Sequence, residues 1–130
     1  MDTLISNVTI VTMNARMDVL FGAHLGVKDG KIAYIGGDKS LITEEIEFAP
    51  DCVLLPGFID EHIHGAAGAD AMDGSVDALK TIANAVATEG TTSFLATTMT
   101  QSPKNILKAM SAVKTYKQLN LADGAEVIGI

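Results

Sequence analysis

The stretch LLPGFIDEHIHG (residues 54–65) ends an apolar run with two of the chain's three histidines, one position apart. Side chains at alternate positions of a strand point to the same face, so extended geometry here places Asp60, His62 and His64 together. Two imidazoles at this spacing can bind one divalent ion, and a carboxylate behind them can orient an imidazole by accepting its other N–H. The pattern His-x-His is common by chance. Its position, after a buried strand and before the Gly-rich segment GAAGADAMDG (residues 65–74), favours a metal site.

On the N-terminal side of this stretch, residues 1–53 read as short strands and turns. Apolar and polar residues alternate on both sides of Asp29-Gly30, and Gly30 tolerates a positive φ, so a two-residue turn can close a hairpin there. We expect a small antiparallel β domain over residues 1–53, with His24 at the surface of one of its strands. The alternative is a loop-rich segment.

From residue 54 onward the pattern changes to strand, helix, strand, helix, strand. The run CVLLPGFID (residues 52–60) is nearly all apolar, as in a strand buried on both faces of a parallel sheet. Pro56 has no main-chain N–H to donate to a neighbouring strand, so this strand should restart at or after Gly57. The next strands are TTSFLATT (residues 91–98) and EVIGI (residues 126–130).

Two helices are predicted between these strands. Ser75 can cap the first helix, which Gly90 should stop, and Ser102 can cap the second, with Pro103 at its first position. Helical spacing predicts their buried faces, which are Val76, Leu79, Ile82, Ala83 and Val86 in the first helix and Ile106, Leu107, Met110 and Val113 in the second. The lysines of the second helix are interpreted as a solvated face: Lys104, Lys108, Lys114 and Lys117. Thr97 and Thr98 end the second strand and are interpreted as ordinary strand residues.

This order of elements fits either a small open sheet or the first part of a barrel of eight βα units. A chain that ends inside a buried parallel strand leaves apolar surface and unpaired backbone groups. We therefore expect an α/β fold in which residues 54–130 form the first units of a (β/α)8 barrel. The small β domain of residues 1–53 precedes it, and the chain is expected to be a piece of a longer protein.

Composition excludes several classes of protein. The sequence is 48% hydrophobic and 19% charged, as in globular domains. No run approaches the roughly 18 apolar residues of a membrane helix and the N-terminus is acidic, so we expect a cytoplasmic protein without membrane contact. A net charge of −7 with scattered basic residues opposes binding to nucleic acid. Cys52 is the single cysteine, which precludes an internal disulfide and agrees with a reducing compartment.

Several motifs carry a family resemblance. LLPGFIDEHIHG resembles the signature of the metal-dependent amidohydrolase superfamily, whose first barrel strand ends in a Pro-Gly, Asp, His-x-His arrangement after a small β domain. HGAAGADAMDG (residues 64–74), EGTTSFLATTMT (residues 89–100) and VIGI (residues 127–130) are similar to N-acetylglucosamine-6-phosphate deacetylases. Ala96 stands where that family has proline. The resemblance covers essentially the whole chain.

The resemblance implies a (β/α)8 barrel with a small β-sandwich built from both chain ends, assembled as a homodimer. It implies hydrolysis of N-acetylglucosamine 6-phosphate to glucosamine 6-phosphate and acetate with one or two divalent metals. Zinc is the first expectation, with iron and manganese as alternatives. His62 and His64 match the family's first-strand metal pair, and the match to its Gly-x-Asp-x-Met-Asp pattern implies a loop-ordering role for Asp70.

The family takes its remaining ligands and its catalytic aspartate from later strands, after a His-Leu-Glu-Gly-Pro-like segment that would follow Ile130. We therefore expect no catalytic residue within residues 1–130 and no deacetylase activity from them alone. No residue is assigned to substrate. Two alternatives stay open: another amidohydrolase of the dihydroorotase or adenine deaminase type, and a self-contained, non-enzymatic α/β module that binds metal or a partner.

Overall fold

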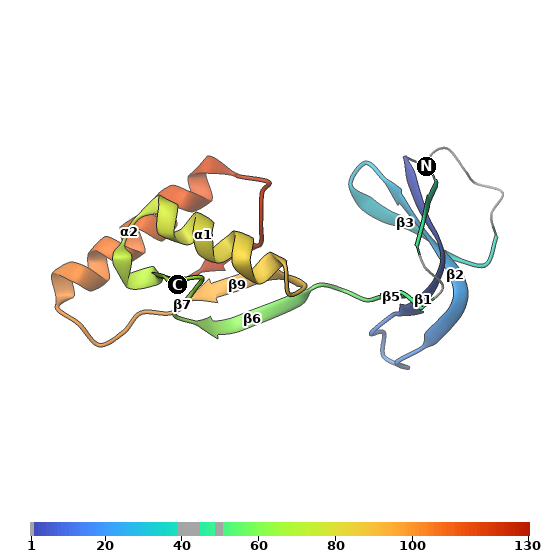
Figure 1. Cartoon of the computed structure of the whole chain (residues 1–130), viewed down its shortest axis with the longest axis horizontal. Coiled ribbons are helices and arrows are strands. Elements are labelled where there is room, and N and C mark those ends of the chain that lie inside the picture. Colours follow the sequence, from blue (N-terminus) through green and yellow to red (C-terminus); the bar gives the residue numbers. More distant parts are fainter. Residues whose placement is uncertain (1, 39–44, 49–50) are drawn as a thin grey trace. The chain divides into compact units, whose positions relative to one another are not determined.

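The computed structural model describes residues 2–38, 45–48 and 51–130. It divides the chain into two compact units, Met1–Pro56 and Gly57–Ile130 (Figure 1). Each unit has its own cluster of buried apolar side chains. No helix in the described part of the chain is long and apolar enough to cross a membrane.

The first unit is a β-sheet built around one central strand. Its strands are β1 (Thr3–Val11), β2 (Val19–Lys28), β3 (Lys31–Gly36), β4 (Glu45–Glu47) and β5 (Val53–Leu54). The order is β3-β2-β1-β4, and β5 also pairs with β1. β1, β2 and β3 are antiparallel neighbours, whereas β4 and β5 run parallel to β1. The prediction of a purely antiparallel unit is therefore wrong for β4 and β5. These strands return to the sheet through a longer connection, which does not force the chain reversal of a tight hairpin.

The hairpin between β2 and β3 is confirmed at Asp29-Gly30. Asp29 has φ 51° and Gly30 has φ 70°, and Lys28 pairs with Lys31 across the turn. Two central residues with positive φ are characteristic of the type I′ turn, whose twist matches that of the flanking strands. The apolar face of this sheet buries Val8, Ile10, Ala23 and Leu25, with Cys52 half-buried against them.

His24 corrects a sequence-based expectation. Its side chain is only 5% exposed, and Nδ1 accepts a hydrogen bond from the main-chain N–H of Asn7 at 3.2 Å. The register of β1 against β2 is irregular between Ile5 and Val8, and Asn7 has φ 57°. An irregular ladder leaves backbone donors without a strand partner. The imidazole satisfies one of them, so His24 is a structural residue inside the first unit and not a surface residue.

The second unit is a mixed α/β structure with the predicted order of elements. Its elements are β6 (Phe58–Ile63), β7 (Gly65–Ala66), β8 (Ala69–Asp70), η1 (Ala71–Asp73), α1 (Val76–Ala87), β9 (Thr91–Ala96), α2 (Pro103–Leu119) and β10 (Glu126–Gly129). Strands β10, β9 and β6 form a parallel sheet in that order, and β7 and β8 form a short antiparallel pair. Figure 1 shows α1 and α2 on the same face of β6 and β9. The sheet of the described residues does not close into a barrel.

The helix starts agree with the sequence analysis. Ser75 Oγ accepts from the N–H of Ala78 at 3.2 Å, and Ser102 Oγ accepts from the N–H of Asn105 at 3.3 Å. Each bond satisfies one of the N-terminal donors that a helix cannot pair internally. α1 ends at Ala87 with Thr88 as its C-cap, and Gly90, at φ 87°, turns the chain into β9.

The buried face of α1 is the predicted one, whereas that of α2 is predicted only in part: Val113 is buried and Ile106 is half-buried. Leu107 is 64% exposed and Met110 is 46% exposed, so neither is a core residue. The buried residues of α2 are Ala109, Ala112, Val113 and Tyr116. Small side chains at a helix contact let the backbones approach closely. The prediction relied on the large apolar residues. The face it included through Leu107 and Met110 is rotated away from the buried face of α2.

β6 was expected to be buried on both faces, and this is wrong within the described chain. Phe58 is 56% exposed and Ile59 is 62% exposed. β6 is an edge strand of its sheet, and the helices cover one face only (Figure 1). The other face of β6 therefore has no covering layer among the described residues.

Candidate metal site at the end of strand β6

His62 and His64 lie together at the carboxyl end of β6. Their ring centroids are 5.1 Å apart and the ring planes are at 88° to one another. His62 is exposed and His64 is half-buried. The carboxyl ends of parallel strands are where α/β folds place their binding sites. The structure thus brings the predicted histidine pair into contact at the expected edge of the sheet.

The two histidines do not reach this arrangement by simple alternation. Asp60 pairs with Phe94 and Ile63 pairs with Ala96, so β6 has one more residue than β9 over this interval. An extra residue in one strand is a bulge, which bends the strand and re-aims its side chains. The prediction placed Asp60 on one face with both histidines because side chains alternate along a strand. That alternation is interrupted at this bulge.

Asp60 interacts with the main chain of the bulge. Its Oδ1 accepts a hydrogen bond from the N–H of His62 at 3.0 Å. This bond fixes the backbone that carries the His62 ring. It does not involve an imidazole nitrogen, so the role of Asp60 as an acceptor for an imidazole N–H stays a prediction.

His64 is held by the neighbouring strand. Its Nδ1 lies 3.0 Å from the main-chain oxygen of Thr97, the residue that follows β9. The N–H of Thr97 in turn donates to the carbonyl of Ile63 at 2.8 Å. Thr97 therefore bonds to the end of β6 through both of its backbone groups: its N–H bonds to Ile63 and its carbonyl oxygen to the His64 ring. The sequence analysis missed this role, because a main-chain contact leaves no signature in residue types.

The segment after His64 is ordered by short-range hydrogen bonds. Asp70 accepts from the N–H of Met72 at 2.7 Å, and Asp73 accepts from the N–H of Asp70 at 2.9 Å. This reciprocal pair is a capping box, and it confirms the expected loop-ordering role of Asp70. The N–H of Ala71 donates to the carbonyl of His64 at 2.8 Å. The loop is therefore tied directly to the backbone of His64.

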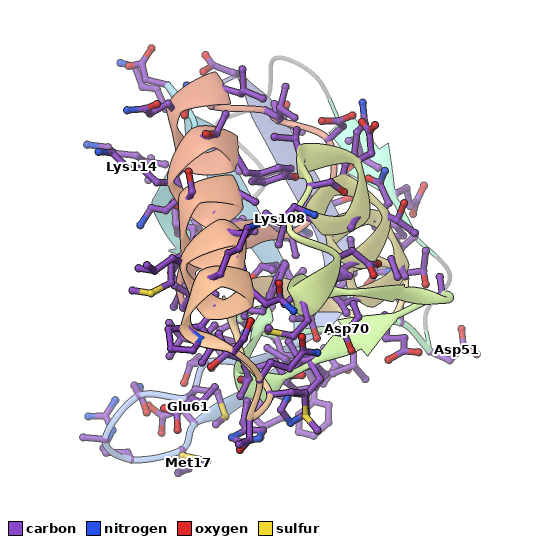
Figure 2. All side chains as sticks on the ribbon, turned by 90° about the vertical axis from the view of Figure 1, so that its left-hand side faces the viewer. Met17, Asp51, Glu61, Asp70, Lys108 and Lys114 are labelled. Carbon is purple, nitrogen blue, oxygen red and sulfur yellow. The ribbon has the colours of Figure 1, made fainter. Side chains whose placement is uncertain are left out.

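Two lysines of α2 are exposed, as predicted, but they also donate hydrogen bonds to main-chain carbonyls. Lys108 Nζ donates to the carbonyl of Asp73 at 2.8 Å, and Lys117 Nζ donates to the carbonyl of Ile128 at 2.7 Å. Figure 2 shows Lys114 extending away from α2, as predicted for a solvated face. Lys108 thus connects α2 to the loop that follows the histidines.

Other charged groups stabilise a different part of this unit. Lys80 Nζ lies 2.9 Å from Asp123 Oδ2, and the hydrogen bond from Lys80 holds the pKa of Asp123 below its usual range. The same hydrogen bond raises the pKa of Lys80. Burial raises the pKa of the Tyr116 phenol. Lys80 and Tyr116 belong to α1 and α2, and the ion pair between Lys80 and Asp123 connects α1 to the segment before β10.

Residues 53–122 match a sequence profile described as the amidohydrolase family. This match spans more than half of the chain and includes both histidines. The chain belongs to the amidohydrolase family.

Several amidohydrolases resemble the chain in more detail. The N-acetylglucosamine-6-phosphate deacetylase of Bacillus subtilis (strain 168) is 42% identical over 131 residues, which cover 98% of this chain and 32% of the relative. The enzyme of the same name from Lysinibacillus sphaericus is 44% identical over 100 residues, covering 76% of this chain and 25% of the relative. The crystal structure of N-acetylglucosamine-6-phosphate deacetylase from Pasteurella multocida aligns with a TM-score of 0.78 at 28% identity, covering 94% of this chain and 32% of that one. The chain spans about a third or less of the length of these relatives.

The histidine pair is the part of this amidohydrolase chain whose chemistry could contribute to a metal site. Neutral imidazole is a good ligand for zinc and for other divalent transition metals. A catalytic zinc ion takes three protein ligands and leaves one position open. Within residues 2–38, 45–48 and 51–130, no group of three or more His, Cys, Asp or Glu side chains is arranged to hold a metal ion. The two imidazoles fit a metal, but the described residues do not complete its coordination.

Proposed function

We propose that this chain is the N-terminal part of a metal-dependent amidohydrolase that converts N-acetylglucosamine 6-phosphate to glucosamine 6-phosphate and acetate. The observation that carries the proposal is the pair of contacting imidazoles at the carboxyl end of β6, in a segment that matches the amidohydrolase family. The 42% identity to a deacetylase over nearly the whole chain supports the choice of substrate.

His62 and His64 are the proposed ligands of a divalent cation, with zinc first and iron or manganese as alternatives. Such a cation, when bound, polarises the acetyl carbonyl and lowers the pKa of water. The residues of this chain prepare the site. Asp60 fixes the backbone of His62, and Thr97 holds the ring of His64. The remaining ligands and the proton-transferring acid are assigned to chain beyond Ile130.

The proposal also assigns roles to the two parts of the chain. Residues 1–53 are the small β domain and residues 54–130 are the first βα units of a (β/α)8 barrel. The apolar residues left exposed on β6, such as Phe58 and Ile59, would then be covered by later barrel elements. The full-length enzyme is proposed to be a cytoplasmic homodimer that acts on a small amino-sugar phosphate and not on nucleic acid or membrane.

The test uses the complete product of the reading frame that contains this chain. Acetate release is measured with N-acetylglucosamine 6-phosphate, and dihydroorotate and adenine are supplied in parallel as substrates of the alternative amidohydrolase types. We expect acetate release from the sugar phosphate and no hydrolysis of dihydroorotate or adenine. Hydrolysis of either ring compound without acetate release would replace the proposed activity with the corresponding alternative.

The same preparation tests the ligands. His62→Ala and His64→Ala should each lower the bound metal and abolish turnover, whereas Lys104→Ala, on the exposed side of α2, should change neither. Metal content is measured by elemental analysis of the dialysed proteins. Full metal content and unchanged turnover in both histidine variants would exclude the ligand assignment.

A further inference from the structure

The contact between His64 and Thr97 restricts the imidazole to one protonation pattern. A neutral imidazole carries its hydrogen on one ring nitrogen and a lone pair on the other. A carbonyl oxygen has no hydrogen to donate, so a hydrogen bond at 3.0 Å between Nδ1 and this oxygen requires the hydrogen on Nδ1. The lone pair of His64 is then on Nε2.

The other two histidines provide a contrast within the same chain. His24 Nδ1 accepts from the main-chain N–H of Asn7, so its lone pair is on Nδ1 and its hydrogen is on Nε2. The ring of His62 is exposed and meets His64 edge to face. The structure therefore holds His24 and His64 in opposite tautomers.

The carbonyl that holds His64 is itself fixed in place. Thr97 donates its N–H to Ile63, the residue directly before His64, at 2.8 Å. On the other side, His64 accepts at its own carbonyl from the N–H of Ala71 at 2.8 Å. The backbone carbonyls of Ile63 and His64 are thus both hydrogen-bonded, and the His64 ring is bonded to the residue that follows β9. One hydrogen bond holds the ring, and the backbone that carries the ring is fixed on both sides.

We propose that the main-chain carbonyl of Thr97 is a positioning group that holds His64 as the Nδ1–H tautomer, so that Nε2 is the atom that binds the cation. This inference rests on the proposed function for the identity of the site, because it takes His64 as a metal ligand. It adds that the metal-free protein already holds His64 in the tautomer that binds metal. His62 completes the pair from an exposed position and is not held in this way.

The tautomers are read from the ring ¹⁵N chemical shifts of the metal-free chain, recorded in alkaline buffer where an ordinary imidazole is neutral. The chain has three histidines, so each ring is assigned by comparison with single His→Gln variants. We expect His64 to have a protonated Nδ1 and an unprotonated Nε2, and His24 to show the reverse. A protonated Nε2 in His64, or the averaged shifts of a free imidazole, would overturn the proposal.

Two changes at the positioning group separate the carbonyl from the side chain. Thr97→Ala removes the hydroxyl but keeps the carbonyl, so the His64 tautomer should not change. Replacement of Thr98 by its α-hydroxy acid turns the Thr97 carbonyl into that of an ester, which is a weaker acceptor. This change should raise the population of the Nε2–H tautomer of His64 and leave that of His24 unaltered. An unchanged His64 tautomer in the ester variant would show that Thr97 does not set it.

Metal binding gives a readout that is independent of turnover. In the full-length protein, the ester substitution should weaken zinc affinity by about 10–100-fold, as is typical when a partner of a liganding histidine is lost. An unaltered zinc affinity would overturn the positioning role. If the tautomers are as expected but the complete protein has no deacetylase activity, the proposed substrate is wrong and the positioning role of Thr97 stands.

Discussion

Gly65 is the position where a single added carbon should disturb the candidate site most directly. A Cβ at this residue would lie 2.1 Å from the carbonyl oxygen of Ala69 and 2.9 Å from the Cα of Asp70. Both are backbone atoms of β8, which pairs with β7 through Gly65 and Asp70. The clash cannot be relieved by a side-chain rotation, so the two strands must separate. Overpacking of this kind costs about 1–3 kcal/mol, and backbone involvement places Gly65→Ala near the upper end.

The assay is urea unfolding of Gly65→Ala beside Gly37→Ala. A Cβ at Gly37 would meet nothing within 4 Å, so that variant should lie within roughly 0.5 kcal/mol of the unmodified chain. With a slope of roughly 1–3 kcal/mol per molar urea, a loss of about 3 kcal/mol lowers the midpoint by about 1–3 M. Because Gly65 follows His64 directly, the His64 ring shifts should change as well. Equal midpoints for the two variants would refute the claim that β7 and β8 need a glycine here.

Three further predictions follow from buried contacts. Phe94 is fully buried in β9, so Phe94→Ala should lower the free energy of unfolding by about 3–5 kcal/mol, whereas Leu107→Ala on the exposed side of α2 should change it by less than about 0.5 kcal/mol; a similar loss in both would contradict the assigned faces. His64→Asn keeps a nitrogen donor at the place of Nδ1, so urea unfolding should find it more stable than His64→Ala by about 0.5–1.5 kcal/mol; equal stability would argue against the bond to Thr97. Burial raises the pKa of Tyr116 in the folded state, so the unfolded chain loses this proton first as pH rises. The resulting stability is present below about pH 10 and lost above it. Tyr116→Phe should therefore show a shallower alkaline decline in thermal melts, and an identical decline would remove Tyr116 as a cause.

Local rules predicted the parts of the fold that depend on local interactions. The turn at Asp29-Gly30 requires positive φ at two residues, and an Asp-Gly pair indicates this directly. Ser75 and Ser102 cap their helices because a hydroxyl before a helix satisfies its first donors. These features need no information from distant segments, so sequence patterns were sufficient.

The errors arose where a distant partner decided the outcome. Ala109 and Ala112 form the α2 contact because small residues allow close approach, while pattern reasoning followed Leu107 and Met110. His24 is buried beside an irregular register in β1, where it accepts a hydrogen bond from a backbone donor.

The candidate site shows the same division between local and distant effects. The histidine pair was visible in the sequence, and the loop role of Asp70 followed from the family resemblance. The bulge between Asp60 and Ile63 and the contact of His64 with Thr97 were not, because both depend on the pairing of β6 with β9. Strand register is set by the partner strand, and a single sequence does not contain that information in a local pattern.

The capping box after His64 has a consequence for the order in which the site forms. Its two hydrogen bonds join residues two and three positions apart in the chain, so closing them costs little loop entropy. The bond between His64 and Thr97 spans 33 positions and must wait for β9 to dock. The loop can therefore be in place on the ribosome, or early in refolding, while the imidazole still rotates. The final step in building this edge of the site is the arrival of a neighbouring strand.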